Sequence, residues 1–232
     1  MTRVDDYRAV LRTLAEQEWP DYLTEHSGLP GPRGNIELGQ AVADEASPER
    51  LDALIATDDE YLVFCGVVGL GRLLAERQAG PVVQRLRSHA GDPRWRVREA
   101  VAMALQRLGD RDLPRLLDLA TEWAADENPL VQRAAAAGLC EPRLLQSPEA
   151  ASAAVDVCDR ATRALAALPL ETRRDEDVRV LRKGLGYCWS VAVAADPAHG
   201  LPRFQALASC ADPDVAWIVR ENSRKARLLR LL

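Results

Sequence analysis

Histidine, cysteine and aromatic residues are scarce in this 232-residue sequence. The three histidines lie far apart and the five cysteines show no Cys-x-x-Cys spacing, which argues against zinc and redox sites. No apolar run approaches the ~20 residues of a membrane-spanning helix. The N-terminal sequence MTRVDDYRAV also lacks the apolar segment of a signal peptide. We therefore expect reduced thiols, no metal, no cofactor, no membrane contact and a cytoplasmic location.

Positive charge is also in deficit, because 30 Lys and Arg residues face 35 Asp and Glu residues, a net charge of −5. This balance argues against a protein whose surface is basic overall, as non-specific binding of nucleic acid requires. Hydrophobic residues make up 47% of the chain, enough for a continuous core. Only two of the 30 cationic residues are lysines, and this bias towards arginine suggests a GC-rich bacterial genome.

A repeat of 34 residues is the main feature that the sequence does contain. Three segments, Asp58–Gly71, Asp92–Leu105 and Asp126–Leu139, each begin with Asp and carry Val five residues later. Looser copies begin at Glu176 and Asp214. Self-similarity at this period is typical of stacked supersecondary units, which form solenoids with long concave surfaces.

Helix-start signals recur along the chain, since Asp, Asn or Ser often stands directly before Pro. The polar side chain accepts hydrogen bonds from free amides, and Pro fits the first helical turn. An amphipathic helix is expected over residues 5–18, followed by a linker over 19–35. The further predicted helices cover residues 36–45, 48–57, 60–78, 81–90, 93–108, 113–125, 129–139, 149–168, 176–195, 201–210 and 213–231.

These patterns predict an all-α fold, a right-handed α-solenoid of about five to six stacked antiparallel helix pairs. Strand signals are nearly absent. We expect residues 1–46 to form capping helices and a linker, and residues 47–232 to form one continuous solenoid domain.

The second helices carry a family resemblance. Asp92–Leu105 resembles the second helix of a HEAT repeat, and Asp126–Leu139 and the segment from Asp214 are similar to it. The resemblance covers roughly residues 47–232 and extends distantly to bacterial HEAT-repeat and DNA-alkylation-repeat proteins. It implies architecture but no single activity, because such relatives include scaffolds, adaptors, phycobilin-lyase-like proteins and glycosylases.

The resemblance also implies a role for an acid and an Arg six residues apart, which in HEAT-like proteins form a ladder between repeats. Asp92 and Arg98 keep this interval, as do Asp214 and Arg220. Glu176 stands six residues before Arg182 in the same way. We expect these arginines to pair mainly with acids of their own or the next repeat.

The repeat register predicts which side chains line the concave face. The third, sixth, seventh and tenth residues after the acidic start share one helix face. In the first repeat these positions are apolar, and we expect the N-terminal helices to cover them. In the other four repeats they hold seven cations against two acids, which predicts a basic groove. The candidate binding residues are Trp95, Arg98, Glu99, Gln132, Arg133, Arg179, Arg182, Lys183, Trp217, Arg220, Glu221 and Arg224.

Two tryptophans occupy the same predicted position. Trp95 and Trp217 each stand third after the acidic start and have Arg on the same helix face. Such a Trp could stack on a base or another planar group. The alternative is that each packs against the next repeat. The same register places Trp189 in the core.

The sequence favours a non-enzymatic scaffold or adaptor that binds a protein partner through its concave face. The alternative is binding of nucleic acid or another polyanion in the basic groove. Glycosylase activity would need a carboxylate beside an aromatic residue, as Glu99 lies near Trp95 and Glu221 near Trp217. No tryptophan-rich catalytic segment, nucleophile–base pair or phosphate loop is found. Catalysis is therefore not expected, and no residue is assigned a catalytic role.

Overall fold

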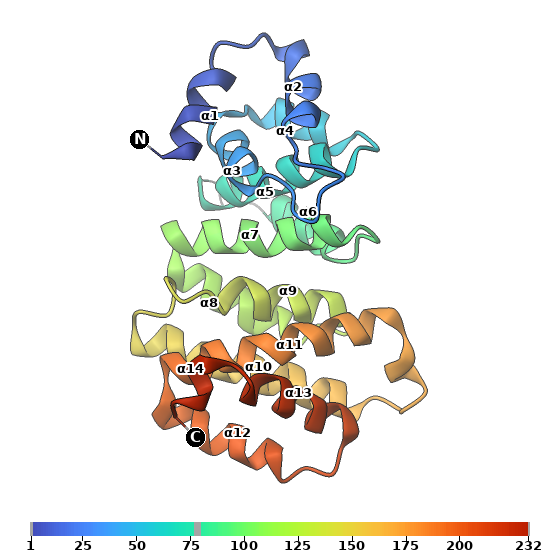
Figure 1. The fold of residues 1–232 in the computed structure, drawn as a ribbon, viewed down its shortest axis with the longest axis vertical. Helices are drawn as coiled ribbons and strands as arrows, with labels where there is room; N and C mark the ends of the chain where they lie inside the picture. The colour runs from blue at the N-terminus through green and yellow to red at the C-terminus, as the bar shows by residue number, and fades with distance from the viewer. Residues whose placement is uncertain (1, 77–79, 232) are drawn as a thin grey trace. The chain divides into compact units, whose positions relative to one another are not determined.

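The protein is all-α in the computed structural model, which describes residues 2–76 and 80–231 (Figure 1). The described residues contain fourteen α-helices, two short 3₁₀ helices and no strand. This confirms the predicted fold class of a helical repeat protein. The chain forms two compact units, unit 1 (Met1–Leu108) and unit 2 (Gly109–Leu232). The handedness of the stack, its continuity and the domain division at residue 46 stay predictions.

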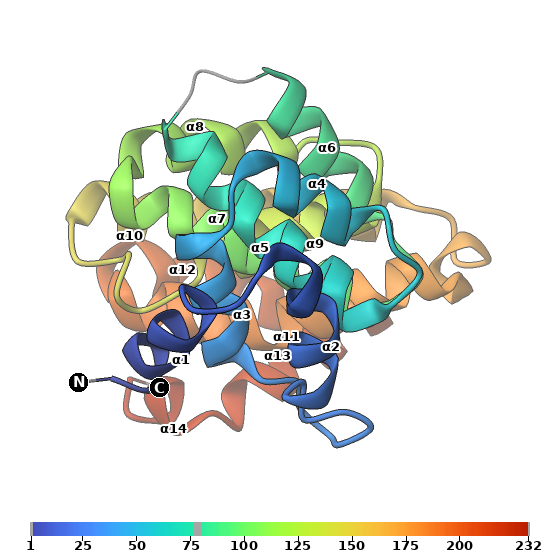
Figure 2. The ribbon, with the colours of Figure 1, turned by 90° about the horizontal axis from the view of Figure 1, so that it is seen from above.

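Unit 1 is built around helix α5, on which α2, α3 and α4 pack. Figure 2 shows α3 beside α5, with α1 next to α3. The helices of this unit are α1 (Arg3–Leu11), α2 (Trp19–Glu25), α3 (Ile36–Glu45), α4 (Pro48–Ile55), α5 (Glu60–Glu76), α6 (Gly80–Ala90) and α7 (Trp95–Arg111), whose last residues belong to unit 2.

The apolar face of α5 is buried, as the register predicts. Tyr61, Phe64, Cys65 and Val68 are all at most 5% exposed. The Tyr61 hydroxyl donates to the carbonyl oxygen of Asn35, with 2.7 Å between the oxygens. Asn35 in turn caps α3, because its side chain accepts a hydrogen bond from the Leu38 amide. The N-terminal helices therefore cover the first predicted inner-face set.

Helices α5 and α7 approach each other closely at a glycine. A Cβ atom built on Gly71 would lie 2.4 Å from the carbonyl oxygen of Ala104 and 2.6 Å from its Cα. Only a residue without a side chain fits at this backbone contact. Val97, Val101 and Leu105 of α7 are fully buried. These apolar contacts, more than surface ion pairs, stabilise the stacked helices.

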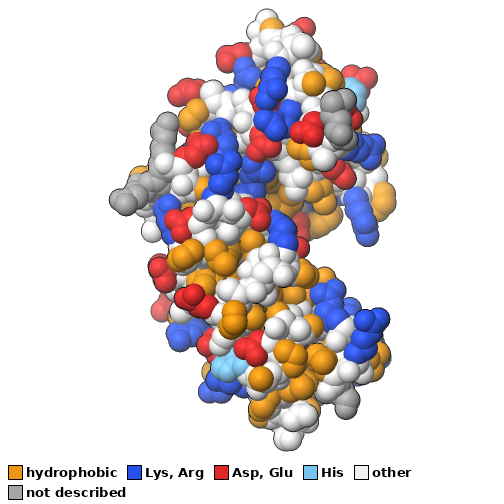
Figure 3. Space-filling model, turned by 90° about the vertical axis from the view of Figure 1, so that its left-hand side faces the viewer, with side chains coloured by type: hydrophobic (Ala, Val, Ile, Leu, Met, Phe, Trp, Pro, Cys, Tyr) orange, Lys and Arg blue, Asp and Glu red, His pale blue; other side chains and the backbone are white. Residues whose placement is uncertain are grey.

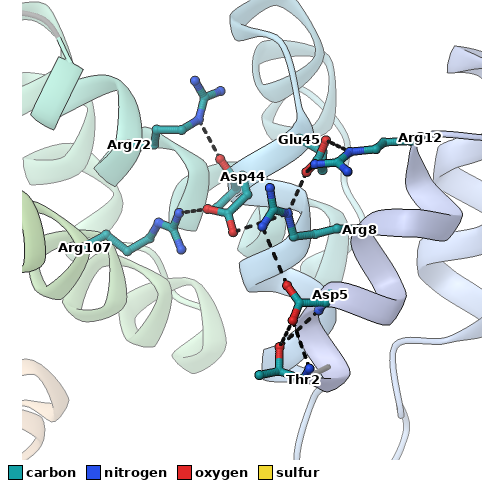
Figure 4. Close-up of polar contacts among 9 residues, drawn as sticks. Thr2, Asp5, Arg8, Arg12, Asp44, Glu45, Arg72 and Arg107 are labelled. Atoms are coloured by element: carbon teal, nitrogen blue, oxygen red, sulfur yellow. Dashed lines mark hydrogen bonds and ion pairs between the residues drawn. The ribbon is translucent and has the colours of Figure 1, made fainter.

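Ion pairs attach the first helix to the rest of unit 1 (Figure 4). The Arg8 and Arg12 guanidinium groups bind the Glu45 carboxylate at the end of α3, at 2.6 Å and 2.7 Å. The neighbouring Asp44 pairs with Arg107 of α7. Arg72 of α5 donates to the backbone carbonyl of Ala43 at 2.7 Å. The end of α3 thus connects three other helices of the unit.

Unit 2 consists of antiparallel neighbours: α8 packs on α9, α10 on α11, and α12 on α13. Its central helix is α11, which also contacts α9 and α13. The helices of this unit are α8 (Leu113–Trp123), α9 (Pro129–Leu139), α10 (Pro148–Ala167), α11 (Glu176–Ala195), α12 (Pro197–Ala208), α13 (Pro213–Ser223) and α14 (Ala226–Leu229).

Two buried polar contacts fix the neighbours of α11. Trp189 is fully buried, as predicted, and its indole nitrogen donates to the Thr162 hydroxyl at 2.9 Å. On the other side, the Asn222 side chain accepts from the Ser190 amide at 2.8 Å and donates to the Leu185 carbonyl at 2.9 Å. Since buried polar groups are costly when unpaired, these bonds specify how α10 and α13 pack on α11.

Three predicted helices were wrong in extent. The helix expected over 5–18 ends at Leu11, and the expected linker contains α2, with Pro20 in its first turn. Helix α12 begins at Pro197, after an Asp196 cap of the same Asp-Pro type that marks other starts. The last helix stops at Ser223 before the short α14. The predicted end of the 60–78 helix lies outside the described residues.

Candidate functional site

The most exposed tryptophan of the described residues lies at the mouth of an apolar pocket in unit 1. Trp95, at the start of α7, is 50% exposed. The pocket has a volume of about 230 Å³. Its lining combines aromatic and aliphatic side chains with three charged ones: Arg33, Gly34, Ile36, Tyr61, Phe64, Trp95, Arg96 and Glu99. We call it the Trp95 pocket.

Arg96 fixes one side of the Trp95 pocket. Its guanidinium carbon lies 4.6 Å from the centre of the Trp95 ring, a cation–π contact. The same guanidinium donates to the Glu60 carboxylate at 2.8 Å and to the Gly31 carbonyl at 3.2 Å. Arg96 therefore holds the loop before α3 against the start of α7, and its charge is offset by Glu60.

Arg98 and Gln132 span the six-residue interval with hydrogen bonds to the backbone of the turn before their own helices. Arg98 donates to the backbone carbonyls of Asp92 and Pro93 at 2.7 Å and 2.8 Å. The Asp92 carboxylate instead binds the Arg94 side chain. Gln132 repeats the Arg98 contact, since its amide donates to the Asp126 carbonyl at 2.6 Å. The side chain at this position therefore binds the turn before its own helix.

In unit 2, Arg182 forms the ladder pair that the resemblance implied. Its guanidinium donates to the carboxylate of Asp214, in the next repeat, at 2.5 Å. It also lies 4.8 Å from the centre of the Trp217 ring. Trp217 rests on Gly186 of α11, where an added Cβ would come within 2.8 Å of the ring. Trp217 thus packs on a neighbouring helix and is partly buried, whereas Trp95 is exposed.

A buried arginine that the register did not select joins the same cluster. Arg173 pairs with the carboxylates of Asp212 and Asp214. It also donates to the Leu168 carbonyl at 2.8 Å and to the Ala166 carbonyl, at the C-terminus of α10. Its side chain is only 8% exposed. Arg173 therefore connects the end of α10 to the start of α13. Its positive charge suits the C-terminus of α10, and the two carboxylates suit the N-terminus of α13.

The basic face predicted from the register is partly neutralised in unit 2. Arg224 pairs with Glu221 at 2.9 Å, and Arg182 with Asp214, an acid that the count left out. Arg179, Lys183 and Arg220 are exposed, and Arg133 packs half-buried beside Gly184. Figure 3 shows side chains of both signs on one face, with Lys and Arg spread from its upper to its lower part. The count of seven cations against two acids therefore overstates the charge.

The Asp212 carboxyl makes stability depend on pH. Burial alone would raise its pKa, but hydrogen bonds from Arg173 and from the Val215 amide outweigh it and lower the pKa below the usual value. A lowered folded-state pKa stabilises the fold above the unfolded value, near 4, and this contribution is lost as pH falls through the folded pKa.

We predict that the free energy of unfolding is nearly constant from about pH 7 to 5 and declines below about pH 4. Denaturant unfolding of Asp212→Asn should show lower stability at neutral pH and a shallower acid decline than the wild type. Asp118→Asn, at an exposed carboxylate of α8, is the control and should follow the wild type. An identical acid decline in Asp212→Asn would contradict the assignment.

The thiols and acids form no recognisable metal site. Among residues 2–76 and 80–231, no group of three or more His, Cys, Asp or Glu side chains is placed to hold a metal ion. Four cysteines are buried and Cys210 is exposed, and none forms a disulfide in the part of the chain that the structure describes. Within that part, no helix is long and apolar enough to cross a membrane.

Comparison with known proteins shows which repeat family part of the chain is similar to. Residues 47–140 match the sequence profile of HEAT repeats. Residues 47–140 are therefore similar to HEAT repeats. The matched HEAT repeats run from Ser47, the cap of α4, to Cys140, directly after α9. They include Trp95, Arg98, Glu99, Gln132 and Arg133 of the predicted inner face. A search of curated protein sequences returns no match.

Solved structures similar to this chain include engineered proteins. Two crystal structures of engineered proteins from the Northeast Structural Genomics Consortium are 17% and 18% identical, each with a TM-score of 0.39. They cover 96% of this chain, and 97% and 95% of their own. A designed armadillo repeat protein in complex with the peptide (KR)4 is 13% identical, with a TM-score of 0.37, covering 95% of this chain and 98% of its own. Because these TM-scores are low, the HEAT assignment rests on the sequence match.

Sequence reasoning identified part of these two clusters. It selected Trp95 and Glu99 of the Trp95 pocket, and Arg182 and Trp217 of the unit 2 cluster. It missed Arg33, in the loop before α3, and Ile36, the first residue of α3, because neither lies in the repeat register. Arg173 was missed for the same reason, although two adjacent arginines before the Asp175 cap mark that segment as unusual.

Proposed function

We propose that the chain is a HEAT-repeat scaffold that binds a protein partner, and that the Trp95 pocket receives an apolar side chain of that partner. The observation that carries this proposal is the half-exposed Trp95 beside a pocket of about 230 Å³. Ile36, 43% exposed, extends the apolar surface at the same place. Large apolar groups rimmed by charged ones are typical of protein–protein contact sites.

The arrangement suits a peptide side chain better than a stacked base. One face of Trp95 is already covered by Arg96, which is itself offset by Glu60. Glu99 balances the charge of Arg33 in the lining, so the pocket has no excess of positive charge to attract a phosphate backbone. Trp and Arg together are also the residues enriched at binding hot spots.

Selection from a random peptide library displayed on phage tests the proposal. We expect the wild-type chain to enrich peptides that share a large apolar residue. Trp95→Ala should weaken the selected peptides about thirtyfold, the size of a hot-spot loss of ~2 kcal/mol. Tyr187→Ala, at another exposed aromatic residue, is the matched control and should bind as the wild type does. Failure to enrich any peptide, or equal losses in both variants, would contradict the proposal.

Binding of nucleic acid or another polyanion is the second candidate, supported by the exposed Arg179, Lys183 and Arg220 of unit 2. It ranks second because Asp214 and Glu221 offset neighbouring cations. Polyanion binding would fall steeply with added salt, since each phosphate contact releases counterions. Peptide binding in the Trp95 pocket would depend on salt only weakly.

A further inference from the structure

Unit 2 contains an open cavity whose lining is mostly arginine. Its volume is about 220 Å³. The lining residues are Leu170, Arg173, Arg174, Arg179, Arg182 and Asp214. They come from the 3₁₀ segment before α11, from α11 itself and from the start of α13. The register selected two of these residues, Arg179 and Arg182.

The charges in this arginine cavity do not balance. Asp214 accepts hydrogen bonds from both Arg173 and Arg182. Asp212, which is outside the lining, also accepts a hydrogen bond from Arg173. The four guanidinium groups thus face two carboxylates, which leaves two positive charges, on Arg174 and Arg179. Glu176 comes only within 3.9 Å of Arg179, and both side chains are exposed, so water screens that pair.

The inner wall of the cavity is held in place before any ligand binds. Arg173 is fixed by two carboxylates and by two carbonyls at the end of α10. Arg182 is fixed by Asp214 and by the Trp217 ring. A preorganised wall reduces the ordering cost of binding, and Arg offers paired donors that match the oxygens of an oxyanion.

We propose that the arginine cavity binds a phosphoryl group. A phosphoryl group carries a charge between about −1.5 and −2 and three strong acceptor oxygens, which matches two unbalanced guanidinium groups. A single carboxylate would leave one of them unsatisfied. Leu170, 61% exposed at the rim, offers an apolar contact to the molecule that carries the phosphoryl group.

The site is independent of the Trp95 pocket, so each proposal can fail alone. Calorimetric titration of the full chain with inorganic phosphate tests for a free ion. A second titration tests for a phosphorylated side chain. It uses a phosphoserine peptide with leucine beside the phosphoserine, and the same peptide without the phosphate is the control. We expect the phosphate-bearing probes to bind, the unphosphorylated peptide not to bind, and Trp95→Ala to match the wild type.

Matched variants distinguish the cavity from general electrostatic attraction. Arg174→Gln and Arg179→Gln should each weaken phosphoryl binding about tenfold, the loss expected for one charge-assisted bond. Lys183→Gln removes the same charge one turn away on α11, outside the lining, and should change binding less than about twofold. Circular dichroism of each variant verifies the fold.

Two results would overturn the proposal. One is that neither phosphate-bearing probe shows saturable binding up to ~10 mM, so that the dissociation constant lies above that concentration. The other is an equal loss in Lys183→Gln and Arg179→Gln, which means diffuse attraction to a basic surface.

Discussion

Replacing Arg173 with Met should lower the free energy of unfolding by about 3–5 kcal/mol, the cost of removing one partner of a buried ion pair. The Arg173 side chain is 8% exposed, and its guanidinium group contacts two carboxylates and two helix-terminal carbonyls. Without it, Asp212 and Asp214 lose a buried counter-charge, and the end of α10 loses its donor. Denaturant unfolding followed by circular dichroism measures this loss.

Arg163→Met is the matched control for Arg173→Met. Arg163 is 75% exposed and pairs along its own helix, with Asp159 at 3.0 Å. Exposed helix pairs of this kind contribute about 0.3–0.5 kcal/mol. If Arg173→Met costs no more than Arg163→Met, then the network between α10 and α13 does not hold unit 2 together.

Replacing Gly71 with Ala should destabilise unit 1 by about 2–3 kcal/mol, even though Ala favours helices by ~1 kcal/mol over Gly. The added Cβ would lie 2.4 Å from a backbone oxygen of α7. Backbone atoms cannot rotate aside as a side chain does, so α5 and α7 would have to separate. Their buried contacts, which include Val97 and Leu105, would loosen.

Gly80→Ala separates this packing effect from helix propensity. Gly80 begins α6, and a Cβ there would have no atom within 4 Å. This control should be neutral or stabilise the fold by up to ~1 kcal/mol. Equal stability of Gly71→Ala and the wild type in denaturant unfolding would show that α5 and α7 do not pack as described.

The regular part of the fold could be predicted from the sequence because its signals are local. Asn128 before Pro129 satisfies amides in its own turn, and α9 begins and ends where predicted. The start of α10 after Ser147 follows the same rule. The segment of residues 12–35 has no such period, so its helix α2 was missed. Its position depends on tertiary contacts, such as Trp19 being buried under the Arg50 guanidinium.

The site was harder to predict than the fold, for a physical reason. A repeat register places side chains on a helix face but does not show what faces them from other segments. It therefore treated Trp95 and Trp217 as equivalent, although Gly186 provides a packing surface for Trp217. Its count of charges also left out Asp214, which pairs with Arg182. Contacts from loops and from neighbouring repeats decide both outcomes.

Site-specific photo-crosslinking tests the proposed partner binding most directly. A photoreactive amino acid replaces Ile36, at the rim of the Trp95 pocket, or Val10, an exposed residue of α1 outside it. In cells that naturally produce the chain, we predict a discrete protein adduct from position 36 that is absent from position 10. Adding Trp95→Ala should abolish the adduct. No adduct at position 36, or the same adducts from both positions with Trp95→Ala having no effect, would contradict the account.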